Sequence, residues 1–309
     1  MAQLWSQANG FMATSKLSDA LRHAVQPLCR FRQFCDVEEA LGKNRGETVT
    51  WNTYGDTATQ GTDLIENQPM PETDFPISQG TVTVGEKGVA VPYTGKFDDL
   101  SEHPVRQIIN KTLKNDCRRA LDVAAHAQFD ASLLTATGTA GGAITVQTDA
   151  LFSGACIDIE FAHVKTVADT MAEREIPTFD GENYCAIGRP SELRLIRDDL
   201  EAIHQYVSEG WNRIMAGEIG RADAVRMVSQ TNIADAGYTA GDDIYFFGAD
   251  TVTEVVACPE EIRGKIPDDY GRGRGIAWYY LGAFGIIHND TTSAATTAQA
   301  RIVHWGGSS

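Results

Sequence analysis

The segment LSEHPVRQIINKTLKNDCRRALDVAAHAQFDASLL (residues 100–134) predicts one long amphipathic helix. Its apolar and small side chains recur every three or four residues, which places them on one face. This face comprises Val105, Ile108, Ile109, Thr112, Leu113, Cys117, Ala120, Leu121, Ala124 and Gln128. Much of the remaining surface is polar, namely Lys111, Lys114, Asn115, Arg118, Arg119, Asp122 and Asp130. From residue 104 to residue 134 the helix spans about 45 Å at about 1.5 Å per residue, a length that indicates a strut.

Both ends of this helix have sequence signals. Ser101 is the expected N-cap, Glu102 suits the positive end of the helix dipole, and Pro104 is tolerated in a first turn. The segment TATGTAGGAITVQTD (residues 135–149) is rich in glycine and other small residues, so it predicts a hinge or turn that ends the helix.

The chain before the helix predicts an arm followed by a long β excursion. Residues 1–45 predict an N-terminal arm with a short helix at residues 16–25. GETVTWNTYG (residues 46–55) alternates polar and apolar residues as a strand does, and residues 81–97 predict a strand pair that turns at residues 85–88. The segment between them is polar and contains several prolines. A loop of this length is uncommon in a compact domain, so it is expected to be either disordered or ordered by a partner, and the partner is favoured.

The chain after the helix predicts a mixed α/β lobe and then a return to strands. Between residues 149 and 269 helical and strand-like patterns alternate, which is typical of a lobe built on a central sheet. Helices are expected at 159–174 and 190–203, and strands at 183–188, 224–232, 243–248 and 251–257. Two further strands are expected at 275–290 and 298–306, so the predicted fold class is α+β.

The composition is that of a globular chain. Among its 309 residues 42% are apolar, and no apolar run is long enough to cross a membrane. The N-terminus lacks a charged start followed by an apolar block, so no secretory signal is expected. The six cysteines form no CxxC pair and have no zinc-ligand spacing, which favours reduced, mostly buried thiols in a protein made in the cytosol.

The charge balance is strongly acidic. A net charge of −16 and a sequence pI of about 4.8 argue against a nucleic-acid-binding surface, because such surfaces need clustered lysine and arginine. This balance favours solubility and repulsion from DNA and membranes. Arg22, Arg30 and Arg32 form a local basic group near the N-terminus, for which a DNA site is the weaker interpretation.

The sequence contains no recognisable catalytic, cofactor-binding or metal-binding constellation. Residues 271–275 (GRGRG) lack the Lys-Ser/Thr of a phosphate loop and precede a strand instead of following one, so a turn is expected there. No GxSxG motif occurs, and no two histidines have HExxH spacing. His126 lies in the long helix and is interpreted as a packing or surface residue. A nucleotide-dependent α/β enzyme using residues 271–275 is the least favoured function.

A resemblance is carried by several segments through their order along the chain. They are VPYTGKFDDLSE (91–102), the long helix, NYCAIGRPSELRLIRDD (183–199), GEIGRADAVRMVSQTN (217–232), YFFGADTVTEV (245–255) and ARIVHWG (300–306). Their order resembles that of the tailed-phage major capsid proteins with the Hong Kong 97-like fold, over roughly residues 46–306. The residue patterns are similar to those of the N4-like branch of these proteins.

The resemblance implies a division of the chain and a function. It implies an N-terminal arm (1–45), an extended loop (46–97), a peripheral domain with a spine helix (98–148), an axial α/β domain (149–270) and a return to peripheral strands (271–309). It also implies a non-enzymatic protein without a cofactor that self-assembles into the pentamers and hexamers of an icosahedral phage head. The head encloses double-stranded DNA without sequence-specific binding. Scaffolding, portal and decoration proteins are expected partners, with assembly in the host bacterial cytoplasm and a final place in the virion capsid.

By the same resemblance, the extended loop lies across a neighbouring subunit. Its expected aromatic anchors are Trp51, Tyr54, Phe75 and Tyr93, because buried aromatic side chains dominate interface energies. An encapsulin-type compartment, which encloses enzymes instead of a genome, is the alternative with the same fold. The chain length and the N4-like segments favour the phage capsid.

Overall fold

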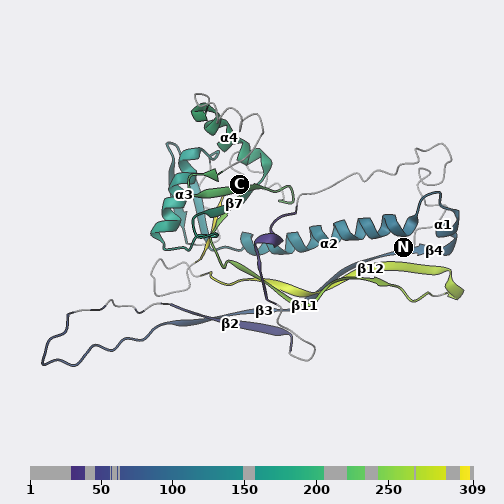
Figure 1. Ribbon diagram of the computed structural model, residues 1–309, viewed down its shortest axis with the longest axis horizontal. Helices are drawn as coiled ribbons and strands as arrows, with labels where there is room; N and C mark the ends of the chain where they lie inside the picture. The colour runs from purple at the N-terminus through teal and green to yellow at the C-terminus, as the bar shows by residue number, and fades with distance from the viewer. Residues whose placement is uncertain are drawn as a thin grey trace.

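A computed structural model describes residues 29–38, 46–55, 57, 61, 63–148, 157–204, 221–233, 243–267, 269–289 and 300–306 (Figure 1). The helix expected at residues 16–25 and the small-residue linker between the last two expected strands lie outside these residues. In Figure 1 the long helix α2 runs along a curved sheet, and the α/β lobe stands at one end of the helix. A two-stranded ribbon extends away on the other side of the sheet.

Helix α2 spans Val105–Asp130, so the predicted strut is confirmed, with a length of about 39 Å for 26 residues. Its buried stripe has four-residue spacing along the whole helix: Val105, Ile109, Leu113, Cys117, Leu121, Ala125 and Phe129. Four positions differ from the expectation. Ala125 and Phe129, which the sequence pattern did not place on the apolar face, are buried. Thr112, expected on the apolar face, is exposed, whereas Asp122, expected on the polar face, is buried. A buried carboxylate needs hydrogen-bond donors, and apolar periodicity carries no information about them.

Both ends of α2 also differ from the expectation. Ser101 does not cap it, because this residue ends the preceding helix α1 (Gly95–Leu100), whose last turn its backbone N–H completes. The chain enters α2 directly after Pro104. At the other end, strand β5 (Leu134–Thr139) takes residues that were expected to complete the helix.

The sheet against α2 has four strands in the order β1–β11–β12–β4. Their bounds are β1 (Asp36–Glu38), β11 (Val252–Gly264), β12 (Gly273–Ile286) and β4 (Gly85–Thr94). β1 pairs with β11 in parallel, and the other pairs are antiparallel. Trp278 and Tyr280 of β12 are buried with Leu113 of α2 in one hydrophobic cluster. Removal of this apolar surface from water holds the helix on the sheet.

Strands β2 (Thr48–Tyr54) and β3 (Ile77–Thr83) form a separate antiparallel ribbon. We call residues 48–83 the extended ribbon. Trp51 fixes its base, because the indole N–H donates to the carbonyl of Ile287 at 3.4 Å and the ring packs over Gly285 of β12. Beyond this base the ribbon projects away from the sheet (Figure 1).

The strand pair expected to turn at residues 85–88 does not form. β3 and β4 follow one another with only Val84 between them, and they belong to different sheets. Gly88 lies inside β4, where an added Cβ would lie 2.6 Å from the carbonyl oxygen of Trp278. The glycine therefore permits a close approach of two backbones instead of forming a turn.

The α/β lobe contains a seven-stranded sheet in the order β6–β5–β13–β10–β7–β9–β8. The further strands are β6 (Ala143–Gln147), β13 (Ile302–Trp305), β10 (Ile244–Phe247), β7 (Tyr184–Gly188), β9 (Val225–Ser229) and β8 (Arg221–Ala222). Helices α3 (Phe161–Glu173) and α4 (Pro190–His204) accompany this sheet. The helices expected at 159–174 and 190–203 and the strands expected at 183–188, 224–232 and 243–248 form in this lobe, whereas the strand expected at 251–257 is β11 of the other sheet.

The hinge expected at residues 135–149 is instead a hairpin of β5 and β6. Gly141 and Gly142 have φ values of 90° and 83°, which glycine adopts without a Cβ penalty, and they form its turn. β5 continues into the sheet by pairing in parallel with β13. Small residues such as Ala136 are buried there, so they serve close packing and not flexibility.

The expected division into domains stays a prediction. Strands on either side of the boundary expected at residue 270, β11 and β12, pair in one sheet. β13, which lies in the segment expected to return to the peripheral strands, pairs with β10 and β5 in the sheet of the lobe.

Candidate functional surfaces

The N-terminal segment of the described chain is anchored by an aromatic side chain. Phe31, next to the short helix η1 (Arg32–Phe34), is fully buried between the end of α2 and strand β10. Its ring centroid lies 4.8 Å from that of His126, 5.3 Å from that of Phe129 and 5.7 Å from that of Tyr245. Aromatic contacts of this kind add to the energy of area burial, so Phe31 ties the segment to both the helix and the lobe.

Asp122 of α2 accepts hydrogen bonds from two distant parts of the chain. Its carboxylate, 1% exposed, accepts the backbone N–H of Phe31 at 2.8 Å and the side-chain amide of Asn232 at 3.0 Å. The side-chain amide of Gln230 donates to the same carboxylate. Gln230 and Asn232 directly follow β9 of the lobe. Charge-assisted bonds of this kind offset the cost of burying a carboxylate.

Arg32 makes a second set of charged contacts beside the first. Its guanidinium donates to Glu254 of β11 at 2.9 Å and to Glu260 at 2.9 Å. Burial disfavours the charged guanidinium, but the hydrogen bonds to Glu260 and Glu254 outweigh it, so the pKa of Arg32 is raised. Glu254 is 1% exposed and also accepts the hydroxyl of Tyr280 at 2.9 Å. We call Phe31, Arg32, Asp122, Gln230 and Glu254 the junction cluster.

The histidine of the long helix belongs to a network beside this cluster. His126 Nε2 lies 2.9 Å from the Tyr245 hydroxyl, and the His304 ring stacks on the Tyr245 ring at 4.5 Å. His304 Nε2 in turn lies 3.0 Å from a carboxylate oxygen of Asp243. Burial lowers the pKa of His126. The packing interpretation of His126 is confirmed.

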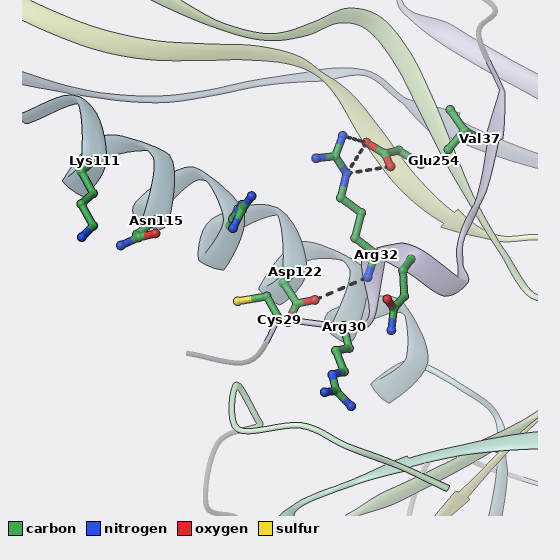
Figure 2. Close-up of a pocket in the computed structure, with 10 residues that line it drawn as sticks. Cys29, Arg30, Arg32, Val37, Lys111, Asn115, Asp122 and Glu254 are labelled. Carbon is green, nitrogen blue, oxygen red and sulfur yellow. Dashed lines mark hydrogen bonds and ion pairs between the residues drawn. The ribbon is translucent and has the colours of Figure 1, made fainter. Parts of the chain in front are cut away.

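A groove lies beside α2 where the N-terminal segment crosses the helix (Figure 2). Its volume is about 860 Å³, and its lining includes Arg30, Lys111, Asn115 and Arg118. Figure 2 shows Lys111 and Asn115 on successive turns of α2, with Arg30 on the N-terminal segment. Lys111 and Arg118 are exposed. We call this the basic groove.

The sequence indicated the parts of this groove but not their assembly. Arg30 is part of the basic group near the N-terminus, and Lys111 and Arg118 are on the polar face of the long helix. Nothing in the sequence joins these two sets. The contact of Phe31 with α2, which joins them, spans about ninety residues of chain.

The extended ribbon presents apolar side chains to solvent. Tyr54 is 80% exposed and Phe75 is 57% exposed. Leu64, Ile65, Met70 and Ile77 are exposed as well. Six exposed large apolar side chains within one projecting segment are a feature expected of an interaction site.

The four expected anchor residues differ in their exposure. Tyr54 and Phe75 are accessible, and their contact with a neighbour stays a prediction. Tyr93 is 4% exposed within the hydrophobic cluster of α2 and the four-stranded sheet, so its ring is used inside its own subunit. Trp51 is half-buried against β12 and fixes the base of the ribbon. The alternating pattern located the strands but did not reveal which surface each aromatic ring meets.

The described residues contain no group of three or more His, Cys, Asp and Glu side chains that could hold a metal ion. Within the same residues no helix is long and apolar enough to cross a membrane. Residues 271–275 form the end of η2 (Asp269–Gly271) and the start of β12, where Gly275 pairs with Pro92, so the turn into a strand is confirmed. Burial raises the pKa of Cys117 and of Cys185 to about 11.

Comparison with known proteins gives a fold likeness without a sequence likeness. No family model matches the chain, and no curated protein matches it. A chain of the capsid structure of the cyanophage P-SCSP1u has a TM-score of 0.67 at 9% identity, covering 96% of this chain and 93% of that chain. A chain of the capsid of Ralstonia phage GP4 has a TM-score of 0.65 at 13% identity, covering 100% of this chain and 98% of that chain.

A third solved structure, the capsid of a native GTA particle, has a TM-score of 0.63 at 12% identity and covers 99% of this chain and 98% of that chain. These likenesses extend over nearly the whole length of both partners. The expected α+β class is therefore confirmed, and the chain has the Hong Kong 97-like fold of these phage capsid structures.

Proposed function

We propose that this chain is a phage major capsid protein that self-assembles into the pentamers and hexamers of an icosahedral head around double-stranded DNA. The likeness of nearly the full chain to phage capsid structures is the observation that carries the proposal. The collinear segments between residues 91 and 306 support the N4-like branch as its nearest subgroup. In this function the protein is a structural component of the virion and not an enzyme.

The extended ribbon supports this function physically. Its exposed apolar side chains and its length beyond the base at Trp51 leave surface that a single subunit does not bury. Burial of apolar area contributes about 25 cal/mol per Å², so a neighbouring subunit covering this surface gains association energy. We propose that, within the extended loop expected at residues 46–97, the projecting ribbon at residues 48–83 lies across that neighbour, with Tyr54 and Phe75 as anchors, while β4 stays in the four-stranded sheet.

The other parts of the chain take the remaining roles of a shell subunit. In this proposal α2 with the four-stranded sheet forms the peripheral layer and the seven-stranded lobe is axial. The sequence-based bounds 98–148, 149–270 and 271–309 describe this division only approximately, because β5, β6, β11 and β13 lie across them. The arm at residues 1–45 joins the rest through the junction cluster. Scaffolding, portal and decoration proteins are the proposed partners, and assembly takes place in the host bacterial cytoplasm.

The first test is direct observation of particles. The purified chain, expressed alone and with its neighbouring phage genes, is viewed by negative-stain electron microscopy, and closed icosahedral shells are expected. Packaged nucleic acid in particles from infected cells supports a phage head, whereas co-purifying cargo enzymes would support an encapsulin-type compartment. Only monomers under both expression conditions would contradict a shell function.

The second test removes the extended ribbon. Deletion of residues 56–75 is expected to leave a soluble, folded protein that forms no closed shells, because the described residues of this stretch (57, 61 and 63–75) lie outside the hydrophobic clusters of the subunit. Circular dichroism and melting temperature check the fold, and electron microscopy counts closed particles. Normal particles from the deletion would refute the role of the ribbon.

A further inference from the structure

The basic groove carries positive side chains without acidic partners in the described part of the chain. Lys111 and Arg118 lie two turns apart on α2, and Arg30 joins them from the N-terminal segment. Among the described residues no ion pair involves any of these three side chains. The carboxylates nearby, Asp122 and Glu254, are buried and bonded within the junction cluster. The groove therefore has excess positive charge in a chain whose net charge is −16.

The extended ribbon has the opposite charge. No lysine or arginine occurs between residues 48 and 85. The carboxylates of this stretch are Asp56, Asp63, Glu66, Glu72 and Asp74. The last four belong to the described residues and are exposed. Acidic and apolar side chains thus occur together along an extended segment that contains no lysine or arginine.

The two surfaces do not meet within one subunit. α2 lies on one side of the four-stranded sheet, and the ribbon leaves from the other side and projects away from the helix (Figure 1). The base of the ribbon is held at Gly285 of β12, which fixes this direction. A contact between the acidic segment and the basic groove therefore requires two molecules.

We propose that the basic groove of one subunit receives the acidic segment at residues 63–74 of a second copy of this chain. This rests on the proposed function, because it names the surface that the extended ribbon contacts in the shell. Guanidinium groups bind carboxylates through paired hydrogen bonds. Arg30 and Arg118 supply two guanidinium groups in the basic groove. Complementary charge fixes the register of docking and accelerates encounter. A groove of about 860 Å³ suits the side chains of an extended peptide.

The test is a reciprocal charge reversal in the full-length chain. The groove variant carries Lys111→Glu and Arg118→Glu, and the ribbon variant carries Asp63→Lys and Glu66→Lys. Each is expected to lower the yield of closed particles by about tenfold or more, because like charges then face each other across the contact. The combined variant carries all four changes and is expected to recover most of the wild-type yield, since the charges are complementary again.

A matched control separates the effect of a change in net charge from the effect of its position in the basic groove. Lys165→Glu with Arg194→Glu makes the same change in net charge at exposed positions of α3 and α4, and its particle yield is expected to equal that of the wild type. Melting temperatures near that of the wild type are required of every variant. The assembly rate of the wild type is also expected to fall as salt screens the contact, over a Debye length of about 10 Å at 0.1 M.

The outcomes separate this inference from the proposed function. A wild-type chain that forms no shells overturns the proposed function and the inference with it. Wild-type shells together with normal assembly of the groove variant overturn the inference alone. Failure of the combined variant to recover, with all variants folded, also overturns it and leaves residues 1–28 or a scaffolding segment as the occupant of the groove.

Discussion

The junction cluster buries charged side chains, whereas the extended ribbon exposes apolar ones. In the junction cluster, Asp122 and Glu254 are buried charges, and each is supplied with donors from distant parts of the same chain. In the ribbon, Tyr54 and Phe75 are apolar groups left in water. Burying charge is costly unless it is paired, and exposing apolar surface is costly unless it is later covered. The first region is thus complete within one chain, and under the proposed function the second is completed by assembly.

The largest loss of folding stability is expected from a change at Asp122, in the junction cluster. The change Asp122→Ala leaves the Phe31 N–H and the amides of Gln230 and Asn232 without their acceptor. Unsatisfied buried donors cost about 1–3 kcal/mol each, so the free energy of unfolding is expected to fall by about 3–5 kcal/mol. Chemical denaturation measures it. Asp169→Ala, at an exposed position of α3, is the control and is expected to change stability by less than about 0.5 kcal/mol.

A smaller effect is expected at the neighbouring hydroxyl. Tyr280→Phe removes the donor to buried Glu254 and keeps the ring, so a loss of about 1.5–3 kcal/mol is expected, as for hydrogen bonds to charged groups. Tyr279→Phe removes a similar bond to Glu86 on the exposed side of the same strand and is expected to cost less than about 0.5 kcal/mol. Equal losses in both variants, measured by thermal unfolding, would contradict the distinction between buried and exposed partners.

The smallest effect on folding, and a clear effect on assembly, is expected in the ribbon. Phe75→Ser removes an exposed ring, so the stability of the subunit is expected to change by less than about 0.5 kcal/mol. The yield of closed particles is expected to fall several-fold, because aromatic anchors carry much of the energy of an interface. Phe75→Leu retains apolar surface and is expected to assemble better than the serine variant. A large loss of stability in Phe75→Ser would place the ring inside the fold instead.

Regular periodicity explains what the sequence predicted well. Four-residue spacing over the buried stripe of α2 is a local property, and so is the apolar run of β10, where all four residues are buried. The helical position of Asp122 is also predictable from local sequence. Its burial is not, because it depends on Phe31 and Gln230, about a hundred residues away on either side. No local signal contains those partners.

The incorrect predictions at residues 135–149 and 85–88 have a common physical cause, because small residues are compatible with more than one backbone structure. Glycine and alanine at residues 135–149 are compatible with a hinge and with a close-packed hairpin, and the pairing of β5 with β13 decides for the hairpin. At residues 85–88 glycine is compatible with a turn, but the approach of β12 to Gly88 requires a strand. Tyr93 could not be assigned to its own core or to a neighbour from alternation alone, because a strand pattern does not state what covers each face.

The pairing of β1 with β11 has a consequence for the timing of biosynthesis. Asp36 is aligned with Thr253, and Arg32 binds Glu254, 222 residues later in the chain. At about 5–20 residues per second, a ribosome needs roughly 10–45 s to make the intervening polypeptide. During that interval the N-terminal segment has no docking strand, and the charge of Arg32 has no buried partner. Completion of the later strands is therefore the event that closes the fold, and under the proposed function a nascent chain still on the ribosome is not yet competent to join a shell.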